Sequence, residues 1–186
     1  MTREQELIES SERGDAGARK ALYSLYVRYL SAVCSRYITD SDGVKDVLQD
    51  SFIKIFQSLD KFEWRGEGSL KSWMTRIAVN ECLKRLRDSR RRDTVSYVAE
   101  VPDIAEDDGE DGDMSAGDIP PEVIHSMIRD LPEGYRTVFN LYVVEGLSHR
   151  EIAEMLGIGE ATSASQLHRA KKMLAGKIRE YMASGK

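Results

Sequence analysis

The chain has 186 residues and a formal net charge of −5, from 27 basic and 32 acidic side chains. This length suits one ordinary domain or two small ones, and an apolar content of 41% excludes disorder of the whole chain. No apolar run approaches the roughly 20 residues of a membrane span, and the charged N-terminus predicts no secretory signal. The two cysteines, Cys34 and Cys82, lack the spacing of a zinc site or a disulfide framework. We therefore expect a soluble cytoplasmic protein in a reducing setting, without a metal or other cofactor and without membrane insertion.

The N-terminal half of the chain has the apolar periodicity of three helices. A first helix is expected after Asp15, which can cap it, and a second helix opens at Asp42. A break with two glycines at 65–68 precedes a third long helix, for which Ser69 is the expected cap. No strand is predicted, so we expect an all-α lobe over residues 1–93. The residues expected to face its core are Ala18, Leu22, Leu25, Tyr26, Tyr29, Val33, Tyr37, Val44, Val47, Leu48, Ile55, Phe56 and Leu59.

The second predicted helix also has a polar side, and its side chains have no expected partner within a small lobe. Four polar residues recur there at helical spacing, namely Asp46, Gln49, Asp50 and Lys54. Spacing alone favours a face that is simply solvated. The alternative is a contact with a basic helix of another protein.

The third predicted helix combines aromatic, amide and basic side chains. Its basic end either complements the helix dipole or follows a phosphate backbone, and the side chains before it suit unstacked bases of a single strand. The two aromatic residues before the glycine break could hold an extruded base. Each aromatic residue could equally belong to the core. The candidate single-strand-binding residues are Phe62, Trp64, Trp73, Arg76, Asn80, Lys84 and Arg87.

An acidic joint follows this lobe. Between residues 94 and 121 the chain has nine acidic residues and no basic one, so the net charge is +3 before the joint, −9 within it and +1 after it. The stretch EDDGEDGDMSAGDIPP has too few apolar residues to fold alone. The joint, residues 94–120, is therefore either a solvated tether or an acidic strand that occupies a positively charged channel.

The second lobe, residues 121–186, is also predicted to be helical. A helix is expected from about Glu122, after two prolines. A break at 131–134 precedes a second helix that reaches Gly146. Ser148 and Glu151 then form a capping box, and Gly157 suits a left-handed turn before a longer helix from about residue 161. A short helix, a glycine turn and a longer helix predict a helix-turn-helix.

The second helix of such a motif reads DNA in the major groove. Its expected outward residues include glutamine and arginine, which contact base edges, and serine, threonine and lysine, which hold phosphates. A plain helical hairpin with a solvated face is the alternative interpretation. The candidate DNA-reading residues are Thr162, Ala164, Ser165, Gln166, His168, Arg169 and Lys172.

Enzymatic functions find little support. The sequence has no phosphate-binding Gly-Lys-Ser/Thr loop, no paired histidines at metal spacing and no Gly-x-Ser-x-Gly motif. We therefore expect no catalytic residues, no metal site and no small-molecule substrate.

Three stretches occur together in the order of one known family. They are DVLQDSFIKIFQSLDKF, SLKSWMTRIAVNECLKRLR and, after the acidic joint, LPEGYRTVFNLYVVEGLSHREIAEMLGIGEATSASQLHRAKKML. In these stretches the chain closely resembles the extracytoplasmic-function (ECF, group IV) sigma factors of bacterial RNA polymerase, within the sigma-70 family. The resemblance covers about residues 5–180 and is far more specific than a helix-turn-helix alone.

The resemblance implies a region 2 domain at 1–93, a linker at 94–120 and a region 4 domain at 121–186. It implies that the Asp46–Lys54 face docks on the β′ clamp helices of core RNA polymerase, with the β flap as a further contact. It also implies that the candidate single-strand residues, with the 62–68 loop, read and open the −10 element, and that the reading helix contacts the −35 element. An anti-sigma factor is the partner expected to hold such a protein inactive.

The chain departs from the family pattern at the start of the reading helix. The family commonly has Gly-Thr-Val-basic-Ser-Arg there, whereas this chain has the sequence ATSASQ at 161–166. Two cations are missing, so the −35 sequence cannot be carried over from relatives. The family's linker threads toward the active centre and the RNA-exit channel, where the −9 segment could stand in for RNA until the transcript displaces it.

Two other functions are consistent with parts of the sequence. A stand-alone helix-turn-helix regulator predicts a symmetric operator, a dimer and no affinity for polymerase. An adaptor that binds a partner through the acidic joint predicts indifference to DNA. Neither lobe has the charge for tight duplex binding, so we expect weak promoter binding by the free chain and strong binding by its complex with polymerase. The sequence leaves open whether the two lobes pack together in the free chain.

Overall fold

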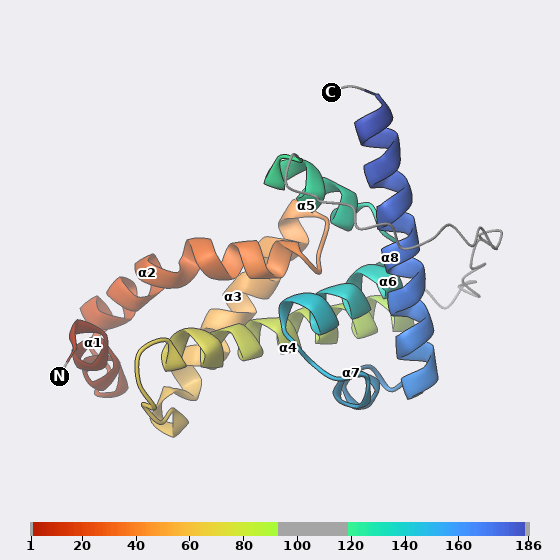
Figure 1. Ribbon diagram of the computed structural model, residues 1–186. Helices are drawn as coiled ribbons and strands as arrows, with labels where there is room; N and C mark the ends of the chain where they lie inside the picture. Colours follow the sequence, from red (N-terminus) through yellow and green to blue (C-terminus); the bar gives the residue numbers. More distant parts are fainter. Residues whose placement is uncertain (1, 93–118, 185–186) are drawn as a thin grey trace.

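The computed structural model describes residues 2–92 and 119–184, and both ranges are helical without strands (Figure 1). This confirms the all-α prediction. The joint at 94–118, with the roles expected for it, lies outside the described residues, as do the side chains of residues 90–92. The elements of the first lobe, residues 2–92, are α1 (Arg3–Glu12), α2 (Ala16–Ser35), α3 (Ser41–Gln57), the 3-10 turn η1 (Leu59–Lys61) and α4 (Ser69–Arg92). Those of the second lobe, residues 119–184, are α5 (Pro121–Arg129), α6 (Glu133–Phe139), the π-helical turn η3 (Asn140–Val144), α7 (His149–Leu156) and α8 (Glu160–Ala183).

The first lobe is built around α2, α3 and α4, which pack on one another, and α1 lies against α2 (Figure 1). Asp15 caps α2 as predicted, because its Oδ1 accepts the backbone N–H of Ala18 at 2.9 Å. The helix α1 was not predicted, although Thr2 and Gln5 form a capping box at its start.

Three details of the first lobe differ from the prediction. The helix expected to open at Asp42 begins one residue earlier, at Ser41, because Asp40 caps it by accepting the backbone N–H of Gly43. Ser69 is the first residue of α4, and its hydroxyl donates to the carbonyl of Gly66 instead of capping the helix. Leu25 is 60% exposed, since the buried stripe of α2 runs through Leu22, Leu30, Val33 and Cys34 and leaves Leu25 beyond its edge.

In the second lobe, α7 and α8 form the predicted helix-turn-helix. Glu151 accepts the Ser148 N–H at 2.8 Å and Ser148 Oγ accepts the Glu151 N–H at 3.3 Å, which completes the predicted capping box. Gly157 ends α7 in the left-handed conformation, with φ +67°. The helix expected to reach Gly146 is instead divided, because α6 continues after Phe139 as the π turn η3.

The conformation of the turn between α7 and α8 predicts how substitution of its glycine changes stability. We expect Gly157→Ala to lower the free energy of unfolding by about 1 kcal/mol, because a residue with Cβ disfavours a φ of +67°. Nothing within 4 Å would contact the added Cβ, so backbone strain is the only expected cause. Gly176→Ala is the matched control: it also has open space but lies inside α8, and should raise stability by roughly 0.5–1 kcal/mol. Chemical denaturation of the full chain measures both, and effects of the same sign would contradict this account.

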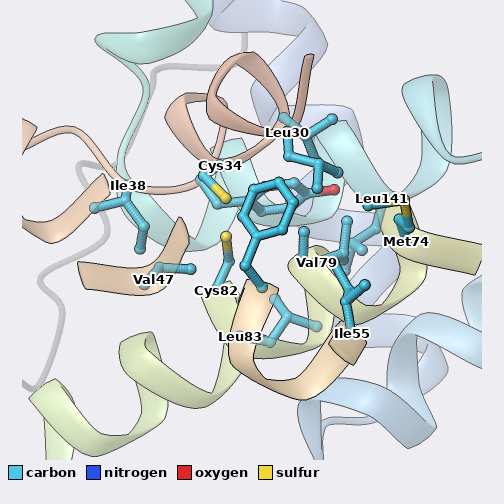
Figure 2. Packing of buried hydrophobic residues seen from close by; sticks show 14 of the residues in the cluster. Leu30, Cys34, Ile38, Val47, Ile55, Met74, Val79, Cys82, Leu83 and Leu141 are labelled. Carbon is cyan, nitrogen blue, oxygen red and sulfur yellow. The ribbon is translucent and has the colours of Figure 1, made fainter. Parts of the chain in front are cut away.

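The two lobes share one hydrophobic core. Val138, Leu141, Ile152 and Leu167 of the second lobe belong to the same buried cluster as the inner faces of α2, α3 and α4. Figure 2 shows Leu141 in this cluster together with Met74 and Val79 of α4. A smaller cluster lies within the second lobe, where α5 and α6 pack on α8. The described chain is therefore a closed form in which α6, η3 and α7 lie against the first lobe (Figure 1).

Candidate protein and nucleic-acid interfaces

The four polar residues of α3 all lie on the surface. Asp46, Gln49, Asp50 and Lys54 are exposed, and the second lobe leaves this face open in the closed form. Within the described residues, Gln49 and Asp50 have no side-chain hydrogen bond or ion pair. Ile53, which the sequence analysis did not single out, adds a 48% exposed apolar side chain to the same helix. The combination of two carboxylates, an amide and an isoleucine suits a protein contact whose partner carries basic groups.

Two residues of this face are already paired within the lobe. Asp46 meets Arg85 of α4 at 3.2 Å, and both side chains are substantially exposed. Lys54 pairs with Glu81, whose side chain is only 5% exposed. Because a buried carboxylate needs a compensating charge, Lys54 stabilises the fold as well as facing a candidate partner.

On α4, the polar candidates form one exposed stripe. Arg76, Asn80, Lys84 and Arg87 follow one another at helical spacing and all are exposed. Three cations and an amide in a line can follow a nucleic-acid backbone and contact unstacked bases. We call this set the α4 stripe.

The aromatic candidates lie at one end of α4 and are half-buried. The rings of Phe62 and Trp73 are 5.2 Å apart and tilted by 49°, so the loop before α4 is fastened to the helix by an aromatic pair. Trp64 is also half-buried, and all three side chains pack against the shared core. These residues therefore contribute to packing, and each keeps an exposed part that can contact a base.

On α8, most of the candidate reading residues face solvent. Thr162, Ala164, Ser165, His168 and Arg169 are exposed, while the buried residues of the same turns are Ser163, Leu167 and Ala170. Ser163 hydrogen-bonds His149 of α7 at 2.9 Å and so fixes the two helices of the motif to each other.

Two further candidates on α8 are half-buried instead. Gln166 is half-buried and its amide lies beside Gly134 of α6. Together with Arg87 of the α4 stripe, it lines a small pocket between the lobes. Lys172 is also half-buried, and Arg169 reaches the hydroxyl of Tyr135 at 3.5 Å. Full access to Gln166 therefore requires that the lobes separate.

The second lobe caps the end of α2. Carbonyl groups just beyond a helix C-terminus lack intrahelical donors, so a packed partner has to supply them. Three side chains do so: Asn140 Nδ2 donates to the Arg36 carbonyl at 2.9 Å, Arg136 Nη2 to the Tyr37 carbonyl at 3.3 Å and Arg129 Nη2 to the Thr39 carbonyl at 3.1 Å. An ion pair joins Arg36 and Glu145 at 3.4 Å. We call these four contacts the lobe seam.

Burial at the lobe seam shifts the pKa values of the ionisable side chains there. Desolvation raises the pKa of Glu145, an effect that the Arg36 guanidinium partly offsets. Burial, and then the Glu145 carboxylate, raise the pKa of the Tyr37 phenol. Burial also lowers the pKa of Arg136, whose other guanidinium nitrogen donates to the carbonyls of Arg129 and Leu131 at 2.9 Å. The lobe seam is thus a polar contact made at a desolvation cost.

The raised pKa of Glu145 predicts a pH dependence of stability. The folded chain binds this proton more tightly than the unfolded chain, so the contribution of Glu145 is fully present below its ordinary pKa of 4.5 and is lost as pH rises through its raised pKa. We therefore expect Glu145→Gln to gain stability over the wild type as pH increases from about 4 to 7. Thermal unfolding across this range, with the exposed Glu180→Gln as control, measures the difference. A parallel pair of pH profiles for wild type and Glu145→Gln would contradict the prediction.

A cleft of about 950 Å³ lies between the α4 stripe and the second lobe. Arg76 and Asn80 line one side of it, and Glu145, Glu151 and Glu154 line the other. Hydrogen bonds with Ser148 are the main cause of the lowered pKa of Glu151, and the charge of Arg76 contributes. In the closed form the candidate single-strand-binding stripe therefore faces carboxylates.

The described residues contain no group of three or more His, Cys, Asp or Glu side chains that could hold a metal ion. No helix among the same residues has both the length and the apolar character of a membrane span.

The comparisons with known proteins agree with this geometry. The family described as Sigma-70 region 2 matches residues 22–92, and the family described as Sigma-70, region 4 matches residues 122–174. The ECF RNA polymerase sigma-E factor of Haemophilus influenzae is 32% identical over 96% of this chain and 97% of its own length. The RNA polymerase sigma-H factor of Pseudomonas aeruginosa is 31% identical over 92% of this chain and 91% of its own.

Among solved structures, the sigma factor RpoE from Bartonella quintana, in complex with the anti-sigma factor NepR, has a similar fold. It has a TM-score of 0.50 and 22% identity, and the match covers 86% of this chain and 96% of that one. Two helical lobes that match regions 2 and 4, with a helix-turn-helix in the second, define a sigma factor of the sigma-70 class. Within that class, the chain belongs to the extracytoplasmic-function sigma factors.

Proposed function

We propose that this chain binds core RNA polymerase through α3 and directs initiation at promoters with −10 and −35 elements. The observation that carries the proposal is the arrangement of three separate surfaces on a chain that matches ECF sigma factors over nearly its whole length. Those surfaces are the acidic face of α3, the α4 stripe and the outward side of α8. None of these roles requires a catalytic residue, so the chain acts as a specificity factor and not as an enzyme.

Each lobe binds one part of the promoter. The α4 stripe and the exposed edges of Phe62, Trp64 and Trp73 capture unpaired bases of the −10 element, because aromatic faces stack on bases while cations neutralise the adjacent phosphates. The first turns of α8 read the −35 duplex in the major groove. The region 2 and region 4 domains extend over 1–93 and 121–186, with the acidic linker at 94–120 between them.

We also propose an anti-sigma factor as a partner. The similar solved structure is that of a sigma factor bound to one. The joint carries a net charge of −9 and suits a positively charged channel of polymerase.

The test is recovery of sheared chromosomal DNA by the free chain and by its complex with core polymerase. The complex should enrich fragments that share two motifs at a fixed spacing, whereas the free chain should enrich none, since few phosphates are neutralised by either lobe alone. Enrichment of a symmetric site by the free chain would instead establish the stand-alone regulator. Indifference of both samples to DNA would support the adaptor.

A further inference from the structure

The two cysteines of the chain meet inside the first lobe. Cys34 lies in the last turn of α2 and Cys82 in the middle of α4, 48 positions later, and these are the only cysteines in the sequence. Both are fully buried, at 0% exposure. Figure 2 shows their sulfur atoms pointing toward one another from α2 and α4. A buried cysteine by itself is commonly a small apolar side chain, but two that face each other from different helices can also form a bond.

The two thiols are chemically unequal. The neighbouring Cys82 thiol lowers the pKa of Cys34. The same contact, followed by burial, raises the pKa of Cys82, and the neighbouring Glu81 carboxylate adds to the rise. Because the thiolate is the nucleophile, Cys34 is suited to attack and Cys82 to resolve.

We propose that Cys34 and Cys82 form a reversible disulfide site that is oxidised by hydroperoxides. The Cys34 thiolate attacks the peroxide, so that an S–O bond forms, the O–O bond breaks and the departing oxygen takes up a proton. The Cys82 sulfur then attacks the resulting sulfenic acid; the S–S bond forms, the S–O bond breaks, and water leaves with the Cys82 proton. With hydrogen peroxide, two thiols and one peroxide yield one disulfide and two waters. A dithiol reductant reverses the change by exchange.

The lobe seam controls access to this site. Tyr37 follows Cys34 by three residues and is fully buried, and its carbonyl accepts a hydrogen bond from Arg136 of the second lobe at 3.3 Å. Tyr37 therefore lies between the thiol pair and the second lobe. Separation of the lobes removes Glu145 and uncovers Tyr37, which opens a route for a small oxidant.

The experiment treats the reduced, folded full chain with hydrogen peroxide and measures intact mass and non-reducing peptide maps. The expected result is a loss of about 2 Da in a monomer, a linked peptide pair containing Cys34 and Cys82, and full reversal by dithiothreitol. The disulfide should also raise the melting temperature by several degrees, because it closes a long loop in the unfolded chain. Cys34→Ala and Cys82→Ala should form no linked pair. If either variant fails to fold, the peptide map of the wild type still shows whether a disulfide joins Cys34 and Cys82.

The access route is tested by the same oxidation in a chain with a weakened lobe seam. Asn140→Ala should accelerate disulfide formation at least about 5-fold, in proportion to a larger open population. The proposed disulfide site would be wrong if the wild-type thiols stay reduced until denaturant unfolds the chain. It would also be wrong if oxidation stops at a sulfinic acid on one cysteine. Equal rates in wild type and Asn140→Ala would overturn the role of the seam.

Discussion

Asp46→Arg/Asp50→Arg is expected to lower the affinity for core RNA polymerase by at least about 100-fold. Both carboxylates lie on the exposed face of α3, and charge reversal replaces attraction to a basic partner with repulsion. Two such reversals are worth roughly 3 kcal/mol or more at a protein interface, which corresponds to this loss. Size-exclusion co-elution with core polymerase, followed by a fluorescence titration, measures the effect.

The double variant should remain folded. Asp46 loses only an exposed ion pair with Arg85, which contributes about 0–1 kcal/mol, and Asp50 has no ion pair to lose among the described residues. The matched control is Glu12→Arg/Asp60→Arg, which makes the same change of net charge at exposed positions on α1 and η1. If the control loses as much affinity as the α3 variant, net charge and not the α3 face would be responsible.

Asn140→Ala is expected to open the closed form. Asn140 is only 1% exposed and donates to the carbonyls of Arg36 at 2.9 Å and Arg136 at 3.0 Å. Its removal leaves the Arg36 carbonyl without a donor, at a cost of about 1–3 kcal/mol, whereas the Arg136 carbonyl keeps the backbone N–H of residue 140. The open population should therefore rise roughly 10-fold to 100-fold. Small-angle X-ray scattering should detect a larger radius of gyration.

Opening should also expose the α4 stripe. In the closed form Arg76 and Asn80 face Glu145, Glu151 and Glu154 across the cleft. We therefore expect the open variant to bind a single-stranded oligonucleotide more tightly than the wild type, in a salt-dependent manner. Because the α3 face is exposed in the closed form, affinity for polymerase should change less. Ser24→Ala, which alters an exposed residue of α2 outside all three candidate surfaces, is the control. An unchanged radius of gyration would show that the shared apolar core alone holds the lobes together.

Much of the local structure was predictable because its causes lie within a few residues. A capping box requires only Ser148 and Glu151, and a left-handed helix end requires only Gly157. The exposure of the α3 face and the α4 stripe follows from helical spacing, since the opposite sides carry the apolar residues. The start of α3 was placed one residue late because Asp40 and Asp42 are equally good helix-opening residues by composition. The roles of these surfaces and the domain boundaries remain predictions.

Sequence pattern was therefore sufficient for every helix except α1, for the caps at Asp15 and Ser148, for the polar faces of α3 and α4, and for the family. Only the tertiary structure decided how the two lobes meet. Arg136 and Asn140 lie in a helical segment whose sequence pattern indicates no special role for either residue. Their partners lie about a hundred residues earlier in the chain. The facing thiols of Cys34 and Cys82 depend in the same way on how α2 crosses α4. Such contacts arise because buried carbonyls and apolar faces must find partners somewhere in the folded chain, and no local pattern specifies where.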